Sequence, residues 1–269
     1  MKNSCSTQTM ITGLKRIGLI SLLIVNTFSA YSWGVTGHRI IGEIAENQLT
    51  DTAKRRINAL LNNASIAMVA NWGDEVRSDP AYDYTATWHY TNIDSGLTRT
   101  AFDSMTLSLN NGQNIYSTVT LTEYLRQIPN DTAMLKMLIH LVGDMHCPLH
   151  LGHAGDRGGN TVQITWFRNP TNLHSLWDSA LIDSQKLSYT EYANHLMRIY
   201  PPNTPSFDGK TLTILDWAWN IYLRAQTVYA SADETGKSYE YIYKYKSLWE
   251  ISLVEAAEHL AALLNYIYN

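Results

Sequence analysis

The chain has 269 residues, of which 45% are hydrophobic, and its formal net charge is −4. This length fits one domain or at most two, and the hydrophobic content is sufficient for a globular core. The acidic balance excludes a nucleic-acid-binding protein that works through a basic surface, so any phosphate site needs positive charge from a bound metal.

The first 32 residues are predicted to be a secretory signal peptide. Three basic residues precede an apolar run from Ile17 to Phe28, and small residues follow where a cleavage site requires them. The run is too short to span a membrane, although a retained N-terminal anchor is the alternative. Cleavage after Ser32 leaves a domain of residues 33–269 with a formal charge of −7, because the leader has three cationic residues and no acidic one. We therefore expect a secreted or periplasmic protein.

Most of the remaining segments are predicted to be helical. Ala53 and Ile57 recur at helical spacing, and an apolar run lies between a capping sequence at Asp131 and Pro148, which ends it. The predicted helices span residues 52–61, 133–145, 190–199, 212–230 and 247–267. A β-like run at residues 161–167 indicates a small hairpin or extended loop. Because strands and helices do not alternate, the sequence favours one all-α domain.

The two cysteines exclude an intrachain disulfide in the mature chain. Cys5 leaves with the signal peptide, and Cys147 then remains alone. Stability is therefore expected to come from core packing and from bound metal.

Two histidine–aspartate pairs have the spacing of one helical turn. His140 and Asp144 are four residues apart, as are His174 and Asp178, so each pair presents an imidazole and a carboxylate on one helix face. These groups are ligands that suit zinc, and His150 follows the first pair closely. A charged Asp144 in an apolar helix also requires a partner cation. The alternative for His140 and Asp144 is a hydrogen-bonded pair in the core.

Further candidate ligands lie upstream of these pairs. Asp74 and His89 have aromatic neighbours rather than a run of charges, and His38 lies five residues after the predicted new terminus. The free α-amine and carbonyl of Trp33 can form a five-membered chelate on a metal, because the amine titrates near neutral pH. The alternative for Trp33 is packing against the domain.

The residues stand in motifs that resemble the zinc-dependent, single-strand-specific nucleases of moulds, plants and bacteria, the S1/P1 nuclease family. Nine ligand positions match in the family's order. The motifs are Trp33-Gly-Val-Thr-Gly-His38, Trp72-Gly-Asp74-x-x-Arg77, His89-Tyr90, His140-Leu-Val-Gly-Asp144-Met-His146-Cys-Pro-Leu-His150, Gly155-Asp-Arg-Gly-Gly-Asn160 and Asn172-Leu-His174-Ser-Leu-Trp-Asp178. The resemblance implies a mainly helical fold and three zinc ions.

The resemblance also implies which residues bind each ion. The ligands of one zinc would be Asp74, His89, His140 and Asp144. The ligands of a second would be the Trp33 amine and carbonyl, His38 and the shared Asp144. The ligands of the third would be His150, His174 and Asp178, completed by water. Three Zn²⁺ ions against three carboxylates leave a formal charge of +3, which attracts phosphate to an acidic protein.

The implied activity is endonuclease activity on single-stranded DNA and RNA with 5′-phosphate products, and 3′-nucleotidase activity is a further expectation. A water between the two close zinc ions is expected to ionise near neutral pH and to attack phosphorus in line. Asp74 and Asp144 are the expected catalytic carboxylates. Arg77 is expected to orient Asp74 or to contact the phosphoryl oxygens, and a plain surface arginine is its alternative.

Other polar residues receive weaker roles. Tyr90 and Asn92 lie where the family lines a nucleobase pocket, although other members have Phe and Asp there, and Asn160 is a third candidate substrate-binding residue. His146 is expected to contact the metal ligands without binding metal itself. His153 is expected at the surface, and His195 and His259 are expected to have structural roles. Cys147 stands where the family commonly has Gln.

Two rival functions remain. A zinc-dependent phospholipase C shares the fold and metal cluster of these nucleases, but it has a longer gap between the terminal Trp and the next His, and Glu where this chain has Asp178. A non-catalytic zinc-binding protein would need no open coordination position, whereas the third predicted site has only three protein ligands.

Overall fold

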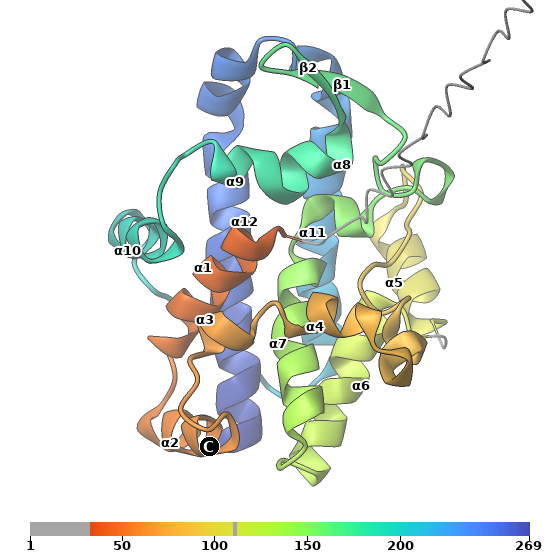
Figure 1. The fold of residues 1–269 in the computed structure, drawn as a ribbon. Coiled ribbons are helices and arrows are strands. Elements are labelled where there is room, and N and C mark those ends of the chain that lie inside the picture. The colour runs from red at the N-terminus through yellow and green to blue at the C-terminus, as the bar shows by residue number, and fades with distance from the viewer. Residues whose placement is uncertain (1–32, 110–111) are drawn as a thin grey trace, which may run out of the picture.

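The C-terminal helix α12 (Ser238–Tyr268) is the longest element of the computed structural model, which describes residues 33–109 and 112–269. Helices α1 (Val35–Glu46), α7 (Thr132–Met145) and α2 (Asp51–Leu60) pack against it (Figure 1). The predicted signal peptide at residues 1–32 lies outside the described residues. The described part is mainly helical with one small sheet, which confirms the all-α expectation.

The other elements surround this core. They are α3 (Ile66–Val69), α4 (Trp72–Glu75), η1 (Val76–Ser78), η2 (Pro80–Thr85), α5 (Arg99–Leu107), α6 (Asn114–Gln127), η3 (Pro148–Leu151), η4 (Ala154–Asp156), β1 (Gln163–Trp166), β2 (Asn169–Asn172), α8 (Leu173–Ser175), η5 (Leu176–Ala180), α9 (Leu181–Asp183), α10 (Tyr189–Ile199), α11 (Thr211–Ala230) and η6 (Ala232–Glu234). In the described residues, no helix is long and apolar enough to cross a membrane.

Helix α7 is the buried helix that the sequence predicted. The carboxylate of Asp131 accepts a hydrogen bond from the Met134 amide at 3.1 Å and caps the N-terminus of the helix. Helices α6, α12, α4 and α1 pack against α7, so its apolar side chains are covered on several faces. Its polar residues His140 and Asp144 are therefore buried within the protein core.

Helix α12 begins nine residues before the predicted start at residue 247. Its first turns carry the exposed Tyr239 and Tyr243, which do not produce the apolar periodicity of a core-facing helix. The sequence also gave no signal for α1, because Gly37 and Gly42 reduce its helix propensity. Packing against α12, α10 and α3 stabilises α1 instead.

The predicted hairpin is present as strands β1 and β2, which lie at the top of Figure 1. Ile164 pairs with Thr171 and Trp166 with Asn169 in an antiparallel register. The two residues of the turn, Phe167 and Arg168, both have positive φ, 45° and 68°. Such a turn usually contains Asn or Gly, so the sequence could not locate it.

A buried histidine pair, His146 and His259, joins α7 to α12. His146 Nδ1–H donates to the Val142 carbonyl at 2.7 Å, and its Nε2 lies 2.7 Å from His259 Nδ1. In the neutral pair, His146 Nε2 therefore accepts a hydrogen bond from His259 Nδ1–H, since the other nitrogen of His146 is already a donor. Burial lowers the pKa of His146 to about 4. Burial also lowers the pKa of His259, so both rings favour the neutral form.

The pair predicts how stability depends on pH. Above about pH 6.5, His146 is neutral in both the folded and unfolded states and contributes no pH dependence. Between about 6.5 and 4, the unfolded chain gains a proton that the folded chain excludes, so stability falls as pH falls. From pH 7 to pH 5, we expect the free energy of unfolding of His146→Gln to fall by roughly 2 kcal/mol less than that of the unaltered protein. Denaturant unfolding with chelator present measures the difference; equal losses in the two proteins would contradict it.

Candidate metal centre

Asp144 is the centre of a buried cluster of imidazoles. One turn along α7 from His140, its carboxylate is completely buried. Its Oδ1 lies 3.2 Å from His38 Nε2, and its Oδ2 lies 3.0 Å from His89 Nδ1 and 3.3 Å from His140 Nε2. One carboxylate therefore contacts three histidines that come from separate segments of the chain.

Two glycines allow these segments to approach α7. A Cβ on Gly143 would lie 2.7 Å from His38 Nδ1, and a Cβ on Gly73 would lie 2.4 Å from His140 Cδ2. Any larger residue at either position would push α1 or α4 away from α7. With α4 in place, Asp74 Oδ1 lies 3.8 Å from His140 Nε2.

The electrostatics of the cluster favour a charged carboxylate among cations. Burial alone would raise the pKa of Asp144, but the charge of His140 and hydrogen bonds from His140, His38 and His89 lower it well below its usual range. Burial also opposes protonation of His140, yet the charges of Asp144 and Asp74 raise its pKa to about 9. For His38, burial and the neighbouring His140 lower the pKa.

The donor atoms suit a metal ion better than they suit one another. His140 Nδ1–H donates to the Ala70 carbonyl at 2.8 Å, so the lone pair of Nε2 faces the cluster when the ring is neutral. That Nε2 lies only 3.1 Å from His89 Nδ1. Two nitrogens at this distance need a proton or a cation between them. His38, His140 and Asp144, and likewise Asp74, His89 and His140, place their donors within 4.8 Å of one another.

Trp33 precedes a backbone contact between its segment and the turn η5. Its side chain is fully buried, and the adjacent Gly34 N–H donates to the Asp178 carbonyl at 2.7 Å. His38 follows five residues later on α1. The segment therefore contacts the turn η5, which carries the candidate ligand Asp178, and the chelate by Trp33 stays a prediction.

A third group of donors lies on η3 and the π-helical turn η5. Burial lowers the pKa of His150 to about 4 and raises that of Asp178 well above its usual range. His150 Nδ1–H donates to the His89 carbonyl at 2.6 Å, which leaves its buried Nε2 without a partner. Asp178 Oδ1 is likewise buried without a partner. His174 stacks beside His150 with ring centroids 5.2 Å apart.

Cys147 is an unexpected member of the third group. Its sulfur, one donor of His150 and one of Asp178 lie within 4.8 Å of one another. His174 stacks on His150 beside this set, and the turn η5 that carries Asp178 is π-helical rather than a regular α-helix. No role for Cys147 was expected from the sequence.

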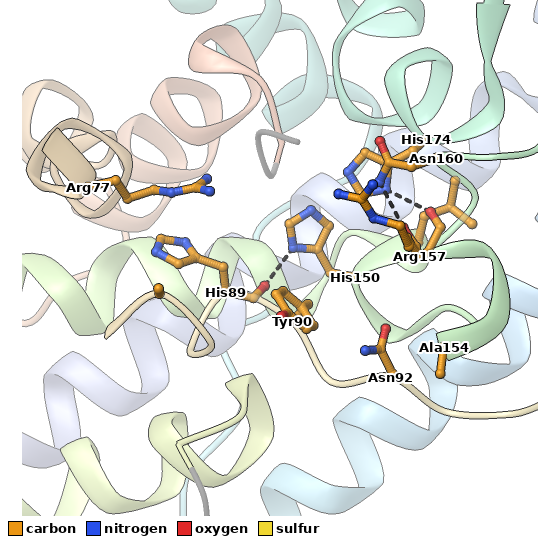
Figure 2. A pocket seen from close by; sticks show the side chains of 12 residues that line it. Arg77, His89, Tyr90, Asn92, His150, Ala154, Arg157, Asn160 and His174 are labelled. Atoms are coloured by element: carbon orange, nitrogen blue, oxygen red, sulfur yellow. Dashed lines mark hydrogen bonds between the residues drawn. The ribbon is translucent and has the colours of Figure 1, made fainter. Parts of the chain in front are cut away.

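A pocket of about 340 Å³ opens beside the third group. Figure 2 shows Arg77 and His89 on one side, Asn160 and His174 on the other, and His150 between them. The predicted substrate-binding residues Tyr90, Asn92 and Asn160 all line it. Arg77 Nη1 also lies 3.5 Å from Asp74 Oδ1, so one side chain connects the pocket to the Asp144 cluster.

Arg157 also lines the pocket, although the sequence did not single it out. It was visible only as part of the segment Gly155–Asn160, without a separate signal. Its backbone has φ of 57° and its carbonyl accepts a hydrogen bond from Asn160 Nδ2 at 2.8 Å. The left-handed turn therefore holds Asn160 and Arg157 together at the rim.

The remaining histidines lie outside the three groups. His146 was expected behind the ligands, but it bonds to Val142 and His259, neither of which is a candidate ligand. His153 is half-buried rather than a surface residue, because it stacks on Tyr229 with ring centroids 3.9 Å apart. His195 is exposed on α10.

Known proteins resemble this chain over nearly its whole length. The sequence model of the S1/P1 Nuclease family matches residues 33–269. Endonuclease 2 of Arabidopsis thaliana is 32% identical over 277 aligned positions, which cover 89% of this chain and 91% of that protein. Endonuclease 5 of the same plant is 26% identical, with coverage of 94% and 97%. Nuclease S1 of Aspergillus oryzae is 26% identical, with coverage of 88% and 92%. The chain therefore belongs to the S1/P1 nuclease family and is a hydrolase that acts on nucleic acids.

Proposed function

We propose that this protein is an exported, zinc-dependent endonuclease. It hydrolyses phosphodiester bonds of single-stranded DNA and RNA, leaves 5′-phosphate products, and also removes 3′-phosphates from nucleotides. The observation that carries this proposal is the buried Asp144 with its three imidazole neighbours, next to a pocket lined by polar and aromatic residues. Imidazole and carboxylate donors in this number suit zinc.

The donor groups divide into three zinc sites. The first comprises Asp74, His89, His140 and Asp144. The second comprises the amine and carbonyl of Trp33, His38 and Asp144. The third includes His150, His174 and Asp178. The orphaned His150 Nε2 and Asp178 Oδ1 support the third site, since a buried polar atom without a partner is costly unless a ligand satisfies it.

When bound, the zinc ions supply positive charge that attracts the phosphate, and they lower the pKa of a bound water to near neutrality. The protein's own side chains hold the substrate. Arg77 can donate to the phosphoryl oxygens while Asp74 keeps its guanidinium in place. Tyr90, which is 40% exposed, offers a ring for stacking on an unpaired base, and Asn92 offers an amide for the base edge. A paired base within a duplex cannot stack in this way, so the pocket favours single strands.

The function is tested by turnover on three substrates. We expect the purified mature chain to cleave single-stranded DNA and RNA, to leave phosphatidylcholine intact, and to lose activity in chelator until zinc is restored. Cleavage of phosphatidylcholine alone would identify a phospholipase C instead. Zinc binding without turnover of any substrate would identify a storage protein.

The shared carboxylate is tested by Asp144→Asn, which keeps the shape but removes the charge. Two zinc sites should weaken together, so zinc content should fall from three ions towards one per chain, and activity by about 100-fold or more. Metal analysis and single-strand cleavage measure both effects. The exposed Asp233→Asn is the matched control and should retain three ions. Three ions and normal turnover in Asp144→Asn would contradict the assignment.

The role of the Trp33 amine is tested by extending the chain. A Gly-Ser extension converts the amine into an amide, which is a poor metal ligand at neutral pH. We expect the extended chain to lack the second zinc and to lose most of its activity. The control carries Gly-Ser after the exposed Asn269 at the other end of the chain. Equal zinc and activity in a chain extended before Trp33 would remove the amine from the site.

A further inference from the structure

Cys147 lies at the junction of two site-bearing segments. It is the N-cap of η3, directly after α7, and its side chain is fully buried. Three residues later, His150 lies on the same short 3-10 helix, and Asp178 approaches from η5. Their donor atoms and the Cys147 sulfur are within 4.8 Å of one another.

The spacing of these donors is close to that of a metal site. Tetrahedral zinc, with Zn–S near 2.3 Å and Zn–N or Zn–O near 2.0–2.1 Å, places its ligand atoms about 3.4–3.6 Å apart. The three donors lie within 4.8 Å of one another, so they need only to move closer together to contact one ion. Both His150 and Asp178 are more than nine-tenths buried, and each has a donor atom without a partner. These two orphaned atoms point to a missing ligand independently of the cysteine.

Burial and the nearby Asp178 raise the pKa of the Cys147 thiol well above its usual range, and backbone hydrogen bonds from Leu149 and His150 only partly oppose this shift. A metal ion bound at the sulfur would release the proton and stabilise the thiolate. Hydrogen bonds from backbone N–H groups stabilise negative charge on sulfur, as they do on other buried anions. The Cys-x-x-His spacing lets one short turn present the sulfur and an imidazole to the same point, as in structural zinc sites.

We propose that the Cys147 thiolate is a further protein ligand of the third zinc ion, beside His150, His174 and Asp178. The inference rests on the proposed zinc centre. It gives that site four protein ligands, and zinc can still expand to five-coordination when a phosphate oxygen binds. The thiolate also lowers the formal charge of three zinc ions with their ligands by one, from +3 to +2, and it makes the third site the softest of the three.

Cobalt substitution tests the proposal on the chain that begins at Trp33, in which Cys147 is the only cysteine. Co²⁺ in the imidazole and carboxylate sites gives visible d–d bands, whereas a thiolate ligand adds a near-ultraviolet charge-transfer band. We expect both in the unaltered chain. Cys147→Ser should lose the charge-transfer band completely and release one ion of three at a lower chelator concentration. Met145→Leu, which removes a buried thioether on α7, should retain the band.

The outcomes separate this proposal from the proposed function. Visible bands without a charge-transfer band would leave the metal centre standing and remove Cys147 from it. No cobalt spectrum at all would contradict the metal centre itself. If Cys147→Ser does not fold, X-ray absorption on the unaltered zinc protein decides the question. We expect one sulfur neighbour for every three zinc ions, with a Zn–S distance of about 2.3 Å. A coordination shell that contains only nitrogen and oxygen would overturn the proposal.

Discussion

The burial of the Asp144 carboxylate is the constraint on which the rest of this structure depends. A carboxylate at zero exposure in an apolar helix is stable only with positive charge or several donors around it. Here α1, α4 and the segment after η2 each bring a histidine or an aspartate to α7, and Gly73 and Gly143 give them room. The core therefore surrounds a buried polar cluster, the Asp144 carboxylate with its histidine neighbours, and the apolar residues of α7, α12 and α1 enclose this cluster.

Backbone carbonyls fix the orientation of the imidazoles. His140, His150 and His174 donate Nδ1–H to the carbonyls of Ala70, His89 and Gly158 respectively. Each hydrogen bond selects the tautomer in which Nε2 carries the lone pair. Metal-binding histidines typically make such a hydrogen bond through the ring nitrogen that does not bind the metal. His89 is a member of one donor group, and its carbonyl orients His150 in another, so the two groups are mechanically connected. A polar pocket then borders both.

The sequence predicted the helical class, the buried helix α7, the hairpin and the residues that gather at the site, because these follow from periodicity, from His-x-x-x-Asp spacing and from motifs in a known order. It could not predict the π-helical turn η5, which carries Asp178, since local spacing assumes a regular α-helix. It also could not predict the partner of His146 or the approach of Cys147 to Asp178. Those contacts join residues from distant segments, and packing alone determines them.

The most direct test of the account is X-ray diffraction from crystals of the mature chain, with anomalous data collected on both sides of the zinc absorption edge. The account predicts three zinc peaks: two within bonding distance of Asp144 and one among His150, His174 and Asp178, at about 2.0–2.3 Å from their donor atoms. An Asp144 carboxylate without zinc on either oxygen, in crystals grown with zinc and free of chelator, would contradict it.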